Sequence, residues 1–356
     1  MPLEIAQPAK RRAKKLSKAT STLEDVARKI GVSPMTVSRA LSRPELVSEE
    51  TLIRVQKAVE EIGYVPNGVA STLASNRSRL VAMMLPTMTN AIFAGYTQAL
   101  TERLSKAGYQ VLLGFTNYSM QVEEDLLATV ITRRPDGIVL TGTQHSPRSL
   151  KLLQAANIPV VETWDKVDET TGPGLDMVVG FSHFQVGEEV ARFLISEGYK
   201  HFGLLWLDDI RGGMRLQGVK RELSRQGIDP CCVKIVKAPA TQQLGRDGFS
   251  EMIDAYPKMD VIICSSDELA FGVLTEARMR GICIPDDLAV IGYGDFAAAS
   301  SVLPSLTTVR INSAEIGTQA AEALIAGMQH RDAGAAARHI DTGFEIVARD
   351  STSRKK

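Results

Sequence analysis

The sequence is poor in the residues on which metal sites, disulfide frameworks and membrane spans depend. Its four cysteines show no C-x-x-C spacing, its five histidines show no metal-ligand spacing, and free thiols are typical of a reducing cytoplasm. No apolar run approaches the ~18 residues that cross a membrane. The basic N-terminus is not followed by the apolar segment of a secretory signal. We therefore expect a cytoplasmic protein that has no contact with a membrane.

The sequence also lacks the motifs of common enzymes. It contains no G-x-x-x-x-G-K-[ST] loop and no G-x-G-x-x-G after a first strand, so a nucleotide would find no phosphate cradle. Ser265 and Ser266 lie outside any G-x-S-x-G motif, which argues against a serine nucleophile. His145 and His183 fall in predicted loops and could at most touch a ligand. We expect no enzyme activity, no catalytic residue, no cofactor and no metal ion.

What the sequence does contain, at residues 22–41, is the pattern of two short helices joined by a tight turn. Thr22 is a good N-cap residue, and Asp25 stands three residues later, where a capping box has its partner. Gly31 follows the apolar stripe of this first helix and can end it with a positive φ.

The second helix of this pair is predicted to enter a DNA major groove. Ser33 caps it, Pro34 occupies its first position, and Val37, Ala40 and Leu41 can pack inward. Short side chains near the start and a longer donor one turn later suit a recognition helix. The residues expected to face DNA are Thr22, Ser33, Pro34, Met35, Thr36, Ser38 and Arg39.

Arg39 is the residue expected to read a base, because its planar guanidinium matches the O6 and N7 acceptors of guanine. Pro34 and Met35 carry no side-chain donor, so they could only contact a thymine methyl group or shape the fit. The alternative interpretation of the two helices is a helical hairpin with no role in DNA binding.

Charge is unevenly distributed along the chain. Residues 1–79 hold 14 Lys or Arg and 8 Asp or Glu, a net charge of +6, whereas the remainder holds 27 and 33, a net charge of −6. A basic head on an acidic body is typical of a phosphate-binding module attached to a small-molecule domain. Residues 1–20 are expected to form a disordered basic arm, which either stays solvated or adds phosphate contacts.

Residues 21–65 are predicted to form a three-helix head, which a linker joins to the rest of the chain. Ser48 starts the third helix and Gly63 ends it. Asn67 can then cap a short helix through Ala74, which is too short to be stable alone in water. We place this segment, at residues 66–79, as a short helix and linker.

From residue 80 the chain alternates between short apolar runs and amphipathic helical patterns. Strands are expected at 80–85, 110–115, 137–141, 159–162, 177–181, 202–207, 233–236, 261–264 and 289–293. Helices are expected at 92–107, 121–133, 147–156, 184–197, 215–226, 242–255, 267–280 and 313–327. This alternation predicts an α/β core at 80–350 with parallel sheets, divided into two similar lobes. Ligands of such folds bind at the carboxyl ends of the strands, here between the lobes.

Several segments resemble the LacI family of bacterial transcription regulators. They are TLEDVARKIGVSPMTVSRAL and GYVPNGVASTLAS near the N-terminus, and GYGDF and PSLTTV in the last third of the chain. The resemblance covers about 330 residues and implies a core built like a periplasmic sugar-binding protein. LPTMTNAIFAG, LTGTQHSPRSLKLLQAANIPVVE and VVGF look most like the gluconate-operon repressors.

The resemblance also implies roles for the linker. In the family this segment is a hinge helix that orders on DNA and wedges a leucine into the minor groove. Leu73 matches that leucine, and Asn67 and Ala70 are expected to contact DNA beside it. Gly68 departs from the Arg or Lys often found there. The alternative is a linker with an incidental leucine.

The family match further implies an effector site. Arg215 matches the arginine that bonds the effector, and Asp267 matches an acid or amide for sugar hydroxyls, although it could equally be a helix N-cap. The loop positions that line the family's cleft are Phe93, Thr141, Trp164 and Phe181. Many members carry an acid where this chain has Gly294, and Asp295 could substitute for it.

The sequence thus predicts a repressor, either a dimer or a tetramer, that binds operator DNA and is released by a sugar acid such as gluconate. The resemblance to the family implies dimer contacts from residues 84–104 and from the region after Ala270. Two alternatives stay open at this point: a cytoplasmic sugar-binding module without a DNA role, and an activator or corepressor-dependent regulator of the same family.

Overall fold

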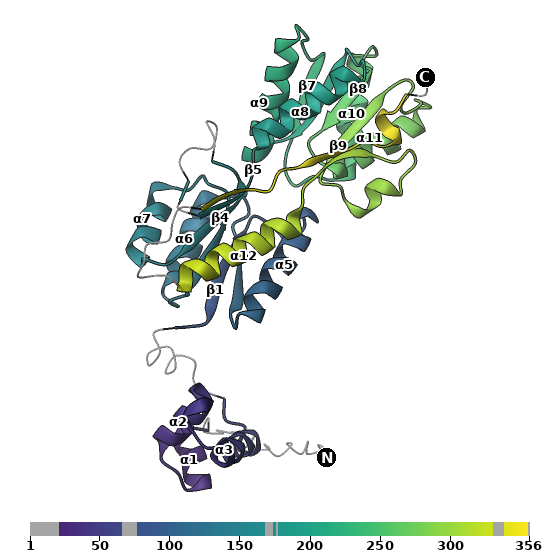
Figure 1. Cartoon of the computed structure of the whole chain (residues 1–356). Coiled ribbons are helices and arrows are strands. Elements are labelled where there is room, and N and C mark those ends of the chain that lie inside the picture. Colours follow the sequence, from purple (N-terminus) through teal and green to yellow (C-terminus); the bar gives the residue numbers. More distant parts are fainter. Residues whose placement is uncertain (1–20, 66–76, 168–173, 176, 330–337, 355–356) are drawn as a thin grey trace, which may run out of the picture. The chain divides into compact units, whose positions relative to one another are not determined.

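The computed structural model describes residues 21–65, 77–167, 174–175, 177–329 and 338–354. The chain divides into two compact units, Met1–Ser78 and Arg79–Lys356 (Figure 1). Across these described segments, no helix combines the length and the apolar character that crossing a membrane requires.

The small unit is a three-helix head whose helix boundaries are those predicted. Its helices are α1 (Leu23–Ile30), α2 (Pro34–Ser42) and α3 (Glu49–Ile62), with a 3₁₀ turn, η1 (Pro44–Leu46), between the last two. Thr22 and Asp25 form a complete capping box at the start of α1, and Gly31 ends this helix with φ +69°. Ser33 and Ser48 cap α2 and α3.

The head is held together by one residue cluster at the meeting point of the three helices. Val26, Val37 and Val55, one from each helix, are completely buried there, and Tyr64 closes the cluster after α3. Arg54 Nη2 donates a hydrogen bond of 2.6 Å to the carbonyl of Ile30, which satisfies an open carbonyl at the end of α1. This bond fixes α3 against the helix pair.

The large unit contains two six-stranded sheets in its described part, one for each lobe. The first has the order β11-β5-β4-β3-β1-β2, with β1 (Leu80–Leu85), β2 (Gln110–Phe115), β3 (Gly137–Thr141), β4 (Val160–Asp165), β5 (Met177–Phe181) and β11 (Arg338–Asp341). The second has the order β12-β10-β9-β8-β6-β7, with β6 (Phe202–Leu207), β7 (Cys232–Val236), β8 (Val261–Cys264), β9 (Ala289–Tyr293), β10 (Thr307–Arg310) and β12 (Glu345–Val347). All pairings are parallel except that of β10 with β12.

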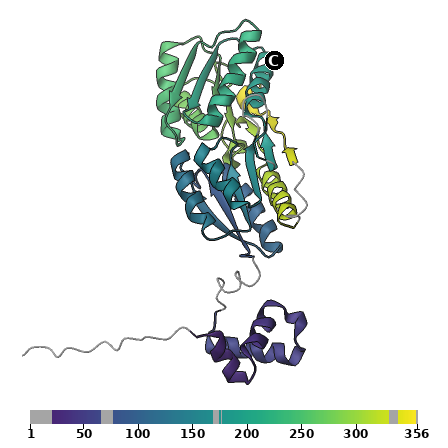
Figure 2. The same ribbon diagram turned by 90° about the vertical axis from the view of Figure 1, so that its left-hand side faces the viewer.

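Helices cover both faces of each sheet, as the alternation predicts (Figure 2). The first lobe has α5 (Ile92–Lys106), α6 (Met120–Ile131), α7 (Pro147–Ala156) and the late helix α12 (Ser313–Gln329). The second lobe has α8 (His183–Ser196), α9 (Ile210–Arg225), α10 (Gln242–Ala255) and α11 (Asp267–Met279), with 3₁₀ turns η2 (Ala297–Ser300) and η3 (Asp350–Thr352). The chain passes between lobes after β5, after β10, and between β11 and β12 (Figure 1).

The largest differences between the structure and the sequence prediction concern one helix start, one strand end, three short strands and the end of the core. Helix α9 begins at Ile210, five residues before the predicted start, because Asp209 caps it by accepting a hydrogen bond from Gly212 N. Strand β4 continues to Asp165, and the short strands β10, β11 and β12 were not predicted. The core also continues past residue 350, since Ser351 Oγ donates to the carbonyl of Val290.

Helices α8 and α9 cross at glycines, which allows their backbones to touch. A Cβ at Gly218 would lie 2.0 Å from the carbonyl oxygen of Phe184, and one at Gly187 would lie 2.0 Å from that of Arg215. Gly213, on the same helix α9, faces open space within 4 Å. Arg215 lies on α9 just before Gly218, and its own carbonyl oxygen is the atom that approaches Gly187. The position of Arg215 therefore depends on this close crossing.

We expect Gly218→Ala and Gly213→Ala to have opposite effects on stability. Gly218→Ala places a methyl group against the backbone of α8 and should lower the free energy of unfolding by about 1–3 kcal/mol. The second removes a flexible residue from a helix interior and should raise it by about 0.5–1 kcal/mol. Urea unfolding of both variants measures the difference; equal effects would contradict the assigned crossing.

Candidate nucleic-acid interface and ligand cavity

Helix α2 buries one face in the head and exposes the other. Val37 and Ala40 lie in the core, whereas Pro34, Met35, Ser38 and Arg39 are exposed and Thr36 is half-buried. No described residue accepts a hydrogen bond from the Arg39 guanidinium, so this side chain can reach outward. The arrangement is that of a recognition helix, with short side chains first and a long donor one turn later.

Thr22 and Ser33 are exposed, but each hydroxyl already has a structural role. Thr22 Oγ1 donates to Asp25 Oδ2 at 2.8 Å, and Ser33 Oγ accepts from Thr36 N at 3.1 Å. Both hydroxyls cap a helix, so any contact with DNA would be additional. The other predicted DNA contacts, Asn67, Ala70 and Leu73, lie outside the described residues.

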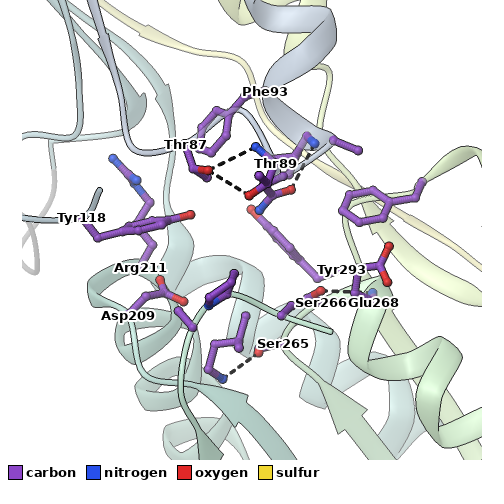
Figure 3. A pocket seen from close by; sticks show the side chains of 18 of the residues that line it. Thr87, Thr89, Phe93, Tyr118, Asp209, Arg211, Ser265, Ser266, Glu268 and Tyr293 are labelled. Atoms are coloured by element: carbon purple, nitrogen blue, oxygen red, sulfur yellow. Dashed lines mark hydrogen bonds between the residues drawn. The ribbon is translucent and has the colours of Figure 1, made fainter. Parts of the chain in front are cut away.

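In the large unit, a cavity of about 340 Å³ lies between the two sheets at the carboxyl ends of their strands. Side chains from both lobes point into it (Figure 3). From the first lobe these include Thr87, Thr89, Asn90, Phe93, Tyr118 and Trp164; from the second they include His183, Asp209, Arg211, Arg215, Ser265, Ser266, Glu268, Tyr293 and Phe296. This is the place where the sequence predicts a ligand.

Arg215 supplies a positive charge to the cavity that no carboxylate in the described part of the chain neutralises. The side chain is 7% exposed, and its guanidinium carbon lies 4.0 Å from the centre of the Tyr293 ring. Nη1 bonds His183 Nδ1 at 3.0 Å, and Nε has no hydrogen-bond partner among the described residues. No described carboxylate lies within ion-pair distance. A buried cation without a counter-ion favours an anionic ligand.

Arg211, four residues earlier on α9, is paired across the lobes instead. Its Nε donates to Asp165 Oδ1 at 2.7 Å, and Thr143 N donates to Asp165 Oδ2 at 3.0 Å. Burial raises the pKa of Asp165, but the charge and hydrogen bond of Arg211 together with the contact to His183 outweigh burial and hold that pKa well below its usual range. Asp165 is therefore ionised, and it joins β4 of the first lobe to α9 of the second.

His183 stays neutral between these groups. Burial lowers its pKa to about 4, assisted by the Arg215 charge and only partly opposed by Asp165. Since Arg215 donates to Nδ1, the proton resides on Nε2, which lies 3.1 Å from the carbonyl oxygen of Trp164. The imidazole thus orients Arg215 without competing with it for an anion.

Comparison with known proteins connects both regions to one class. Residues 22–67 match the bacterial regulatory proteins of the lacI family, and residues 191–352 match a periplasmic binding protein-like domain. The HTH-type transcriptional regulator GntR of Pseudomonas aeruginosa is 36% identical over 336 residues, which cover 93% of this chain and 95% of that protein. The chain belongs to the LacI family.

Two further comparisons agree with this assignment. GntR of Escherichia coli K12 is 30% identical over 332 residues, covering 93% of this chain and 98% of that protein. The crystal structure of a LacI-family transcriptional regulator from Silicibacter pomeroyi superimposes with a TM-score of 0.86 and 32% identity, covering 94% of this chain and 100% of that one. The predicted family, fold and DNA-binding regulatory class are confirmed, and the relatives are regulators rather than enzymes.

Of the predicted effector contacts of this LacI-family protein, Phe93, Trp164 and Arg215 line the cavity together. Phe93 and Trp164 meet edge to face with ring centres 4.9 Å apart. Phe181 is fully buried behind Trp164, at 6.4 Å between ring centres, and supports the wall without lining it. Thr141 lies outside this cavity and lines a second one beside it.

Two predicted contacts, Asp267 and Asp295, do not line this cavity, and their carboxylates are hydrogen-bonded to other groups. Asp267 is fully buried and accepts hydrogen bonds from Thr308 Oγ1 at 2.6 Å and Phe296 N at 2.8 Å; burial raises its pKa to about 6. Its neighbour Ser266 faces the cavity instead. Asp295 bonds Arg310 and Arg349, both at 2.6 Å, and does not line the cavity.

The structure leaves no room for a side chain at Gly294. Gly294 has φ +128°, and a Cβ there would lie 2.5 Å from the Phe296 ring. The aromatic ring therefore occupies the space that a side chain at this position would enter. Phe296 and Tyr293 also line the cavity, and neither was predicted from the sequence as a ligand contact.

The sequence also did not predict Arg211 and Asp165 as residues of the cleft. It predicted for His183 no more than a contact with a ligand. Each follows or ends a strand, and the carboxyl ends of the parallel strands are where polar side chains converge. The signal for Arg211 was the Asp209 cap, which starts α9 early and points this side chain into the cleft.

His145, which the sequence placed in a loop, is buried between two carboxylates. Its Nδ1 lies 2.7 Å from Glu123 Oε1 and its Nε2 lies 3.1 Å from Glu162 Oε1. Burial lowers the pKa of His145, but the hydrogen bond to Glu123 and the nearby Glu162 outweigh it and raise the pKa to about 9. The protonated imidazole thus connects α6 with β4.

We expect the stability of the protein to fall between pH 6.5 and pH 9 because of this group. A folded pKa above the unfolded value stabilises fully below pH 6.5, and the contribution is lost as the pH rises through about 9. At about 1.4 kcal/mol per pKa unit the loss is roughly 3 kcal/mol. Urea unfolding of the protein and of His145→Gln across this range measures it; parallel pH profiles would contradict the assignment.

Proposed function

We propose that this regulator is a cytoplasmic repressor, which binds a near-palindromic operator as a dimer. A sugar acid such as gluconate enters the cavity between the lobes and releases the protein from DNA. The observation that carries the effector assignment is Arg215, a buried cation with no carboxylate partner among the described residues. A ligand can shift the equilibrium only if it binds the DNA-incompetent state more tightly.

The head would read DNA through α2. Exposed Arg39 would contact guanine in the major groove, and Met35 and Pro34 would contribute apolar contacts. Thr22, Ser33, Thr36 and Ser38 offer hydroxyls near the helix start. By family resemblance, Leu73 with Asn67 and Ala70 would act in the minor groove.

Replacement of Arg39 tests the DNA assignment. Arg39→Ala should weaken binding to the DNA upstream of this protein's own gene by about 1–3 kcal/mol, or about 5- to 150-fold, and weaken binding to random DNA much less. Fluorescence anisotropy at fixed ionic strength measures both affinities. Lys57→Ala, which removes an exposed cation of α3, is the control and should change neither affinity substantially.

An equal loss on both DNAs would mean that Arg39 touches only phosphates. The base-reading role would then be wrong, because a phosphate contact carries no sequence information.

The cavity chemistry supports a sugar acid. The cation of Arg215 suits a carboxylate, while Thr87, Asn90 and Ser266 suit hydroxyl groups. Phe93, Trp164 and Tyr293 provide aromatic surface for the carbon chain. The segments that resemble gluconate-operon repressors include LPTMTNAIFAG, which supplies Thr87, Asn90 and Phe93.

Exposed apolar side chains support a dimer. Helix α5, within the predicted contact segment 84–104, packs its buried residues against α12 of the same chain. The exposed apolar residues of the first lobe include Met88 within that segment and Leu112, Leu113 and Phe115 on β2. In the second lobe, after Ala270, Met279 is 69% exposed and Leu303 is 83% exposed. These two patches are our proposed dimer surface.

A further inference from the structure

A second cavity, of about 360 Å³, adjoins the first on the side of β2 and β3. Tyr118, Asp209 and Arg211 line both cavities. Each volume by itself exceeds the ~300 Å³ at which small-molecule pockets begin. The space between the lobes therefore has two compartments, which we call the Arg215 compartment and the Thr141 compartment after one residue of each.

The Thr141 compartment offers mainly hydrogen-bond acceptors. Glu123, Asp165, Asp208 and Asp209 all line it. The hydroxyl of Thr141 already donates to the carbonyl of Met84 at 2.8 Å, so its oxygen is left to accept. A ligand here must donate hydrogen bonds, which sugar hydroxyl groups do.

The charge of the Thr141 compartment excludes an anion. Its one cationic lining residue, Arg211, is tied at Nε to Asp165, and Glu123 is paired with the imidazole of His145, which leaves Asp208 and Asp209 as the carboxylates in excess. Arg215, which has no such partner, lines only the first compartment. The two compartments therefore favour opposite ends of a polar ligand: a carboxylate at Arg215 and a neutral polyol at Thr141.

Tyr118 stands on the border between the compartments. The residue is 48% exposed, and its ring is labelled on the Arg211 side of the cavity in Figure 3. An aromatic ring at this place offers an apolar face to a sugar ring that passes from one compartment to the other.

We propose that the effector is a glycosylated sugar acid, which is longer than a six-carbon acid. Its acid portion occupies the Arg215 compartment, and a second, neutral sugar unit occupies the Thr141 compartment. The inference rests on the proposed function in one respect, the carboxylate at Arg215. It adds the second sugar unit and the residues that receive it.

Isothermal titration calorimetry with gluconate, maltobionate, cellobionate and maltose tests this inference. At least one of the two bionates, which are glucosyl gluconates, should bind at least tenfold more tightly than gluconate. Maltose, which has the second sugar but no carboxylate, should bind at least tenfold more weakly than that bionate.

A variant that fills the Thr141 compartment tests whether the higher affinity for a bionate arises in that compartment. Gln144 is exposed and lines only this compartment. Gln144→Trp should reduce bionate affinity to that of gluconate and leave gluconate affinity unchanged. Gln154→Trp, at an exposed position of α7 outside both cavities, is the matched control and should leave every affinity unchanged.

The outcomes separate this inference from the proposed function. Gluconate binding with no tighter binding of either bionate would overturn the inference and leave the proposed function intact. An equal loss of gluconate and bionate affinity in Gln144→Trp would also overturn it. If neither gluconate nor a bionate binds, the sugar-acid effector is wrong and this inference is wrong with it.

Discussion

The Arg215→Ala variant is expected to bind operator DNA as tightly as the unaltered protein and to remain bound when gluconate is added. Arg215 lies in the large unit, at the cavity, whereas the proposed DNA contacts belong to the head. Loss of a buried charge-assisted contact costs about 2–5 kcal/mol, so gluconate affinity should fall by about 30-fold or more. Calorimetry measures the affinity, and anisotropy with added gluconate measures the release.

Two variants of α9 control this experiment. Arg225→Ala removes a mostly exposed arginine from the last turn of the same helix and should leave release unchanged. Arg215→Lys keeps the charge but loses the planar guanidinium that stacks on Tyr293, and should give an intermediate gluconate affinity. If gluconate still releases Arg215→Ala at the usual concentration, the carboxylate site lies elsewhere.

Asp165→Ala is expected to produce the largest loss of stability among the cleft residues. The substitution leaves Arg211, whose side chain is 16% exposed, without its carboxylate. Thr143 N also loses an acceptor. Removal of one partner of a buried ion pair costs about 3–5 kcal/mol. Urea unfolding monitored by circular dichroism measures the change.

The double variant Asp165→Ala/Arg211→Leu tests whether the unpaired charge is the cause. It should be more stable than Asp165→Ala alone, because no uncompensated cation remains. Asp254→Ala, which removes an exposed carboxylate paired with Arg280, should have no measurable effect. A change below about 1 kcal/mol in Asp165→Ala would show that the pair is solvated rather than buried.

The head could be predicted from the sequence almost to the residue, because its helix ends depend on local chemistry. Thr22 with Asp25, Ser33 with Pro34, and Gly31 each act within three or four residues of themselves. The buried strands were predictable for a related reason, since a fully covered parallel strand is a short continuous apolar run. Strand β11 has the polar sequence RHID and exists because it pairs with β5, far away in the chain.

The cavity was predictable in place but only partly in composition. The topology brings strand ends together, and Phe93, Trp164 and Arg215 do meet there. Asp165 and Arg211 form a contact across 46 positions that no local pattern reports. At the start of α11, successive side chains point in different directions, so a resemblance could not distinguish Ser266 from Asp267. The sequence therefore predicts which strand ends meet at the cavity, but it does not predict which residue at each strand end faces it.

Titration of gluconate into the complex of the unaltered protein with its operator tests the central claim most directly. If a ligand bound between the lobes controls the affinity of the head for DNA, saturating gluconate should weaken operator binding by about 1–3 kcal/mol, or about 5- to 150-fold. Fluorescence anisotropy measures the operator affinity, and calorimetry confirms that the cavity is saturated. An operator affinity that stays constant while gluconate fills the cavity would contradict the account.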